Sequence, residues 1–107
     1  DLLLDTLCDC DLILLESNHD LKMLENGDYP PILKHRIRSD KGHLSNTQSV
    51  ELFKKINQKR LKHLILAHLS EKNNKPELAL KEFLPFVNKE IKLQLAAQDR
   101  CSEVIFL

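Results

Sequence analysis

The 107-residue sequence predicts a layered α/β fold. Two short apolar runs, residues 11–15 and 64–67, each end abruptly in polar residues, which is typical of strands buried on both faces. Between and after these runs, apolar residues recur at helical spacing behind helix-start signals. The expected order is strand, helices, strand, helix, strand, strand. Four strands alone would make a small, one-sided sheet, so we expect residues 1–107 to form a single partial domain whose other half is missing.

The first half of the chain contains signals for one strand and up to three helical segments. Residues 2–7 are expected to be the end of a helix that leads into the strand at 11–15. Residues 20–26 can form a short helix, which Gly27 stops. Two prolines open a further helix over residues 30–38, since proline is tolerated in a first turn. A loop is expected to follow.

A capping box marks the next helix. Ser45 and Gln48 have the required spacing, in which each side chain bonds the backbone N–H of the other residue. A helix should therefore follow Ser45, with three apolar residues near one face: Val50, Phe53 and Ile56. The strand at 64–67 comes next along the chain.

The last third of the chain predicts one helix and two strands. Pro76 begins a helix, and Pro85 should end or kink it near Phe83 because proline cannot continue the helical hydrogen bonds. Residues 91–97 and 103–107 are expected to be strands joined by a polar turn.

Composition narrows the class of protein. The chain is 42% hydrophobic and 30% charged with a formal net charge of +0, which argues against a strongly basic nucleic-acid module or a polybasic membrane binder. A local basic patch or bound metal ions can still neutralise phosphates. Lys34, Arg36 and Arg38 could form such a patch, although a run of this kind is usually a solvated face. The apolar runs are too short to span a bilayer, so no membrane partner is expected.

Three cysteines are present, namely Cys8, Cys10 and Cys101. An odd count without a visible secretory signal predicts reduced thiols and a cytoplasmic protein. Cys8 and Cys10 could be half of a metal site, but no second pair exists to complete a tetrahedral one, which favours two ordinary thiols.

Candidate chemistry lies where the two buried strands end. In open α/β sheets, ligands gather beyond the carboxyl ends of the strands. Glu16, His19 and Asp20 form an acid/base group after the first strand, and Asp20 also suits the N-cap of the next helix. His68 follows the second strand directly. It could be a metal ligand or a histidine that bonds a local carbonyl, and spacing alone favours the second interpretation.

His43 lies just before the capped helix. A helix N-terminus suits a phosphate, and a histidine beside it could protonate a leaving oxygen. The alternative is an ordinary histidine in a surface loop. His35 and His63 are weaker candidates, and we interpret both as structural or solvent-facing.

Three motifs in one order resemble a known family. Glu-Ser-Asn-His-Asp occupies residues 16–20, Ser-Asp-Lys-Gly-His-Leu-Ser-Asn occupies 39–46, and Leu-Ala-His-Leu-Ser-Glu-Lys-Asn-Asn occupies 66–74. Together they closely resemble the bacterial metallo-β-lactamase-fold exonucleases of the YycJ/WalJ type, from about residue 11 to the C-terminus. The resemblance implies that the chain is the C-terminal half of a metallo-β-lactamase αββα sandwich.

The resemblance also implies a metal-dependent hydrolysis of DNA. The family has a dinuclear site for two divalent ions, zinc or manganese, and His68 resembles its last histidine ligand. Glu16 and His43 resemble catalytic residues that assist proton transfer in a related branch, although Leu44 replaces an expected serine. Residues of the same motifs are expected to bind substrate: Asn18, His19, Asp20, Ser45 and Asn46.

One departure from the family is large. The motif His-x-His-x-Asp-His occurs nowhere in the sequence, and the bridging aspartate would lie just before Asp1. We therefore expect the chain to begin partway through a domain and to be inactive without the missing N-terminal half. The alternatives are a metallo-hydrolase of a small ester or lactone, and a non-catalytic remnant of a truncated gene.

Overall fold

The computed structural model describes residues 9–38 and 43–96. Its centre is a parallel sheet of three strands in the order β1-β2-β3: β1 (Leu12–Glu16), β2 (His63–Ala67) and β3 (Lys92–Leu95). Leu12 pairs with His63, and His63 pairs with Lys92. The α/β class and the first three strands are therefore confirmed. The expected helix at 2–7, the turn after residue 97 and the strand at 103–107 lie outside the described residues.

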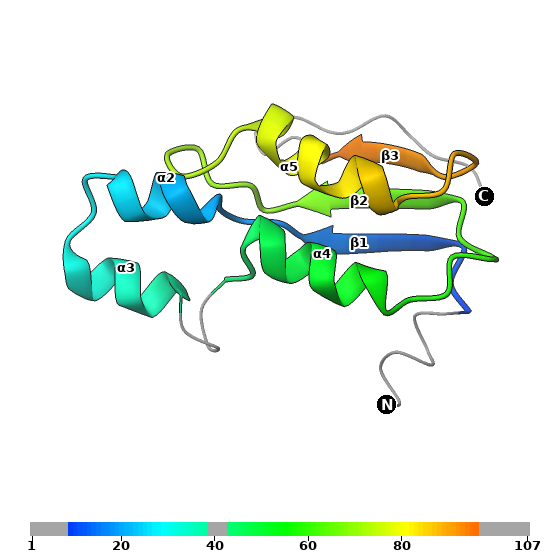
Figure 1. The fold of residues 1–107 in the computed structure, drawn as a ribbon, viewed down its shortest axis with the longest axis horizontal. Helices are drawn as coiled ribbons and strands as arrows, with labels where there is room; N and C mark the ends of the chain where they lie inside the picture. Colours follow the sequence, from blue (N-terminus) through cyan, green and yellow to red (C-terminus); the bar gives the residue numbers. More distant parts are fainter. Residues whose placement is uncertain (1–8, 39–42, 97–107) are drawn as a thin grey trace.

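Two helices cover one face of the sheet (Figure 1). They are α4 (Asn46–Lys54) and α5 (Pro76–Phe83). Right-handed crossovers from β1 to β2 and from β2 to β3 move in one direction across the sheet, so both helices arrive on the same side. The strands and helices share one buried core, which includes Ile13, Leu15, Val50, Phe53, Leu64, Leu66, Ala79 and Phe83. The rings of Phe53 and Phe83 meet at 5.9 Å with their planes tilted by 59°.

The opposite face of β1 is not covered within the described part of the chain. Side chains alternate along a strand, so Ile13 and Leu15 point into the core while Leu14 points the other way. Leu14 is 61% exposed. Strands of parallel sheets are usually covered on both faces, so the exposed Leu14 agrees with the expectation of a one-sided sheet.

The predicted helix signals are confirmed in detail. The Asp20 carboxylate accepts a hydrogen bond from the Met23 N–H at 3.0 Å. In the capping box, the Gln48 N–H donates to Ser45 Oγ at 3.0 Å, and the Ser45 N–H donates to Gln48 Oε1 at 2.9 Å. Pro76 is the first residue of α5.

Two helix ends refine the sequence prediction. Ile56 is buried, but it follows α4 instead of lying on it, because the Ile56 N–H bonds the Phe53 carbonyl at 3.0 Å in a tighter turn. The helix α5 ends at Phe83 and continues as the 3₁₀ helix η1 (Leu84–Phe86), which contains Pro85. The expected interruption near Phe83 is thus confirmed.

The helices α2 (Leu21–Asn26) and α3 (Pro31–Arg38) form an arm beyond the carboxyl ends of β1 and β2 (Figure 1). We call residues 21–38 the α2–α3 arm. Lys34 Nζ donates to the Glu25 carbonyl at 2.7 Å, and Arg38 forms an ion pair with the Glu25 carboxylate. None of the residues of α3 is buried. Across 9–38 and 43–96, no helix combines the length and apolarity that a bilayer crossing requires.

Candidate functional site

Three chain segments meet at the carboxyl ends of β1 and β2. The Ser17 N–H bonds the Ala67 carbonyl at 3.0 Å, and the Asn18 N–H bonds the Leu44 carbonyl at 2.8 Å. These backbone bonds extend the sheet into its loops and join the loop after β1 to the loop after β2 and to the segment before α4. As a result Glu16, His43 and His68 face one another although they are far apart in the sequence.

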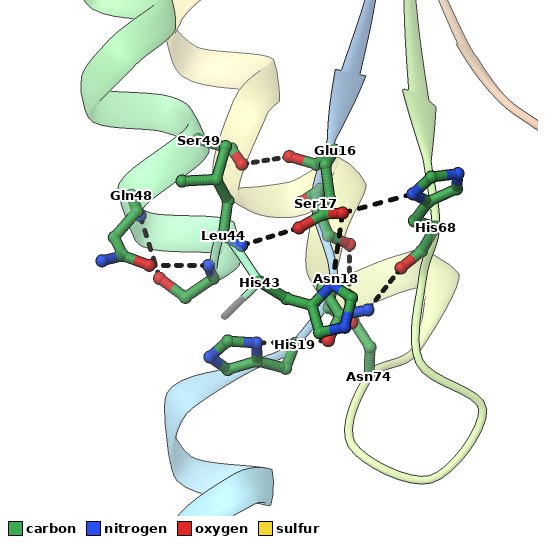
Figure 2. A network of polar contacts seen from close by, with 11 residues as sticks. Glu16, Ser17, Asn18, His19, His43, Leu44, Gln48, Ser49, His68 and Asn74 are labelled. Carbon is green, nitrogen blue, oxygen red and sulfur yellow. Dashed lines mark hydrogen bonds and ion pairs between the residues drawn. The ribbon is translucent and has the colours of Figure 1, made fainter. Parts of the chain in front are cut away.

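The Glu16 carboxylate is the centre of this arrangement (Figure 2). Its Oε1 accepts a hydrogen bond from the Leu44 N–H at 2.7 Å. Its Oε2 lies 3.3 Å from His43 Nδ1 and 3.2 Å from His68 Nδ1. One carboxylate oxygen therefore holds both imidazoles.

The hydrogen bonds determine the charge of Glu16. Burial raises its pKa, but the bonds from the Leu44 N–H, His43 and His68 outweigh burial, so the pKa of Glu16 lies below its ordinary value. The carboxylate is consequently ionised at neutral pH and can only accept hydrogen bonds. Each facing Nδ1 must then carry the proton, which leaves the Nε2 lone pair of a neutral imidazole free for a metal ion or a proton.

His68 has an unusual backbone conformation. Its φ is 57°, in the left-handed region. Among residues 9–38 and 43–96, no other non-glycine residue has a positive φ. Such a residue costs on the order of 1–2 kcal/mol and persists only when its surroundings hold it. Here Asn18 Nδ2 donates to the His68 carbonyl at 2.7 Å. The turn directs the imidazole out of the sheet, where it is 73% exposed.

A group of buried polar side chains lies beneath these residues. We call Ser17, Asn46 and Asn74 the asparagine clamp. Asn74 Nδ2 donates to the Ser17 carbonyl at 3.0 Å, to the Asn18 carbonyl at 3.1 Å and to Asn46 Oδ1 at 3.0 Å. Asn46 Nδ2 donates to Asn74 Oδ1 at 2.9 Å, and Ser17 Oγ donates to Asn46 Oδ1. The clamp thus ties the loop after β1, the start of α4 and the loop before α5.

Asn74 belongs to one of the motifs in the sequence, yet sequence reasoning gave it no role. Its side chain is almost completely buried and bonds carbonyls 57 and 56 residues away. A run of two asparagines in a loop gives no signal for such contacts.

The residues expected to bind substrate divide into two groups. Asn18 lies at the cleft and bonds His68, and Asp20 caps α2. The side chains of His19, Ser45 and Asn46 lie in the interior, with exposed fractions of 1%, 0% and 0%. A role in substrate binding stays a prediction for all five.

His19 is buried as an incompletely bonded imidazole. Its Nδ1 lies 3.3 Å from Asn18 Oδ1, and its Nε2 has no hydrogen-bond partner among residues 9–38 and 43–96. Burial lowers the pKa of His19, and the charge of a protonated His43 adds to this, while the carboxylates of Glu16 and Asp20 oppose it. His19 is therefore neutral at physiological pH.

The first N–H groups of α4 already have partners inside the protein. The Asn46 N–H donates to the His19 carbonyl at 2.8 Å, and the Gln48 N–H donates to Ser45 Oγ. The helix contributes its partial positive charge at this end, but these two donors are not available to a phosphate. The His43 side chain, just before this helix end, is 53% exposed.

A cleft of about 1020 Å³ opens between the sheet rim and the α2–α3 arm. His43, His68 and Asn18 line one side, and residues of the arm line the other, namely Tyr29, Leu33, Arg36 and Ile37. Segment 69–73 completes the wall. The histidines of the site are therefore accessible to a ligand of nucleotide size, since small-molecule pockets measure roughly 300–1,000 Å³.

The described residues do not by themselves make up a metal centre. No group of three or more histidine, cysteine, aspartate or glutamate side chains within 9–38 and 43–96 could hold a metal ion. His68 nevertheless has the arrangement typical of a metal-binding histidine, in which a carboxylate fixes one ring nitrogen and leaves the other for the metal. Cys8 and Cys101 lie outside the described residues, and Cys10 is half-buried against the core.

Comparison with known proteins gives three related enzymes. Over 66 residues the chain is 47% identical to the exodeoxyribonuclease WalJ of Streptococcus pneumoniae serotype 2 strain D39, and equally to that of strain R6. It is 46% identical over 66 residues to the exodeoxyribonuclease YycJ of Bacillus anthracis. The matched segment is 62% of this chain.

The chain spans about a quarter of the length of these relatives, since the match covers 24% of the two streptococcal proteins and 25% of the Bacillus protein. No protein-family model matches the chain, and no solved structure matches it. The similarity expected from the three motifs is thus confirmed: the chain is consistent with a fragment of the YycJ/WalJ type.

Proposed function

We propose that this chain supplies one part of the active site of a metal-dependent exodeoxyribonuclease. The observation that carries the proposal is the contact of His43 Nδ1 and His68 Nδ1 with the same oxygen of Glu16, at the carboxyl ends of two parallel strands. Two histidines aligned by one ionised carboxylate present two ring nitrogens to the cleft. The relatives named exodeoxyribonuclease support DNA as the substrate.

We further propose that the fold is the second half of a metallo-β-lactamase αββα sandwich. The sheet with α4 and α5 on one face would be one αβ layer pair, and the exposed Leu14 on the other face would pack against the first half. That first half would be the main partner of this chain, and it would bring the metal ligands that the described residues lack.

Each residue of the site has a distinct proposed role. His68 would be a ligand of one of two divalent ions, zinc or manganese. Glu16 would hold the ring of His68 in place and keep the Nε2 lone pair available. His43, bonded to the same carboxylate, would bind a phosphate oxygen or donate a proton to the leaving oxygen. Bound divalent ions would lower the pKa of a water molecule and stabilise the charge that develops on the phosphate.

The test uses the protein translated from the complete reading frame that contains these 107 residues. That frame should encode His-x-His-x-Asp-His upstream of Asp1. The purified protein should degrade end-labelled DNA in the presence of zinc or manganese, and should leave a small ester and a lactone intact.

The substitution His68→Ala should remove one bound ion per protein molecule. It should also lower the exonuclease rate by more than about a hundredfold, which is the upper range for loss of a group that only orients a metal ligand. His35→Ala is the matched control, because His35 is an exposed histidine of α3 outside the cleft. Unchanged metal content and rate in His68→Ala, hydrolysis of the esters alone, or a frame without the upstream motif would each contradict the proposal.

A further inference from the structure

We propose that Tyr29, Arg36 and Lys72 form a binding site for an unpaired segment of the DNA strand, next to His43 and His68. The inference rests on the proposed function and names the part of the cleft that holds the substrate. In this site the Tyr29 ring stacks on a base, and the two cations bind the phosphates that flank it.

The position of the three residues carries the first step. Tyr29 lies between α2 and α3, Arg36 lies on α3, and Lys72 lies in the loop after β2, yet all three line the cleft that His43 and His68 also line. A ligand bound to this wall is therefore adjacent to the two histidines. The cleft therefore joins His43 and His68, the proposed reacting groups, to a wall of residues that have no proposed part in the reaction.

The side chains have the combination that binds single-stranded nucleic acid. Lys72 Nζ lies over the Tyr29 ring, 5.8 Å from its centre, so the ammonium group covers one face of the ring and a base would stack on the other face or displace the lysine. Proteins bind single strands through aromatic rings that stack on bases and cations that follow the backbone. Tyr29 is half-buried, so its ring is partly fixed before a base arrives.

The basic residues of α3 point in different directions. Lys34 and Arg38 both contact Glu25, which does not line the cleft. Arg36 does line the cleft. Glu71 also lines the cleft and offsets one positive charge. Arg36 and Lys72 therefore bring two basic side chains to one wall of the cleft, in a chain whose formal net charge is +0.

Stacking on Tyr29 requires a base that is not paired. The wall should therefore prefer single strands and frayed ends to an intact duplex. For an enzyme that acts at the ends of DNA, this preference selects the end of the strand.

The experiment measures binding of a short fluorescent single-stranded DNA to the protein translated from the complete reading frame that contains these 107 residues, by anisotropy, in EDTA so that no hydrolysis occurs. Tyr29→Ala should weaken binding about tenfold or more, the loss expected for one stacked base, whereas Tyr29→Phe should stay within about twofold. Lys72→Ala should weaken binding and make the salt dependence shallower by about 0.7 in the slope of log K against log salt, as for one lost phosphate contact. The matched control is Lys59→Ala, an exposed lysine outside the cleft.

Several results would overturn the inference. These are absence of binding by the complete wild-type protein, equal affinity for the duplex, or equal binding by Tyr29→Ala, Lys72→Ala and Lys59→Ala. The outcome is separate from that of the proposed function, because binding here is measured without metal ions. If the complete protein degrades DNA while Tyr29→Ala binds normally, the strand site is wrong and the nuclease assignment stands. If Tyr29→Ala loses binding while the complete protein has no nuclease activity, the strand site stands and the nuclease assignment is wrong.

Discussion

The asparagine clamp lies beneath the residues on one side of the cleft and the α2–α3 arm lines the other side, but the clamp and the arm are held by different forces. Asn74 in the clamp is 4% exposed and bonds two other chain segments directly, the loop after β1 and the start of α4. In the arm, α3 has no buried residue, and the Arg38–Glu25 ion pair is solvent-exposed. Breaking a buried hydrogen bond costs about 1–3 kcal/mol, whereas an exposed ion pair contributes about 0–1 kcal/mol.

This difference separates two tasks within the cleft. Glu16 ends β1 and His68 directly follows β2, and the clamp lies beneath both, as chemistry with narrow geometric limits requires. Arg36 lies on α3, which has no buried residue and therefore opens locally at lower cost than the core. Under the two proposals, a rigid base carries the reacting groups, and the weakly held helix α3 of the arm contributes to strand binding.

The largest expected difference in stability between core and arm comes from replacing an apolar side chain by alanine. Phe53→Ala should lower the free energy of unfolding by about 3–5 kcal/mol, because Phe53 is 0% exposed and its ring meets Phe83. Ile32→Ala in the arm should change it by less than about 0.5 kcal/mol, because Ile32 is 79% exposed. Urea denaturation followed by circular dichroism measures both. Equal losses would show that the arm is as much part of the core as α4.

The clamp itself gives the next effect. Asn74→Ala removes the donor for two backbone carbonyls and leaves buried polar groups of Ser17 and Asn46 without partners. The expected loss in unfolding free energy is about 2–3 kcal/mol. Asn74→Asp, which keeps the shape but removes the Nδ2 donor, should also destabilise the protein. Asn88→Ala, at an exposed asparagine, is the control and should have almost no effect.

An Asn74→Ala variant as stable as the wild type would contradict the claim that the clamp holds the site more strongly than the ion pair holds the arm. It would mean that the backbone bonds between the loops, such as Ser17 N–H to the Ala67 carbonyl, hold the site without the clamp. Both variants should leave α3 unaffected, because the clamp does not contact the arm through any hydrogen bond described for Asn74.

The sequence predicted the features that depend on neighbouring residues. Asp20 and Ser45 cap their helices, and Pro85 interrupts α5, because caps and prolines act within a few residues of their own position. The meeting of His68 with Glu16 was also predictable, since polar residues after two parallel strands share one edge of the sheet.

Features that depend on distant contacts were not predictable in the same way. No glycine or other local signal at residue 68 indicates a left-handed backbone, because Asn18, fifty positions away in the chain, holds it. His19 was expected to bind substrate, and nothing in its five-residue polar motif shows that its side chain is buried. Ile56 was placed on a helix because its spacing fits, while the turn after Lys54 depends on backbone bonds that spacing does not show.

The smallest expected effect is on the pH dependence of the free energy of unfolding, which should differ between a buried histidine beneath the site and an exposed histidine of the arm. The pKa of His19 in the folded state lies below its ordinary value of 6.5, so the unfolded chain binds more protons in the interval below 6.5. The stability that neutral His19 contributes is therefore fully present above pH 6.5 and is lost as the pH falls below it. For one proton the slope cannot exceed about 1.4 kcal/mol per pH unit.

Unfolding free energies at pH 7.5 and 5.5 measure this loss. His19→Gln should reduce the difference between the two pH values, whereas His35→Gln, at an exposed histidine of the arm, should keep it. Glu16 does not interfere, because its folded-state pKa is lowered from 4.5, and its contribution is lost only as the pH falls below 4.5. If His35→Gln reduced the pH dependence as much as His19→Gln, the arm would hold its histidine as strongly as the interior beneath the site does. The distinction between a rigid base and a weakly held arm would then fail.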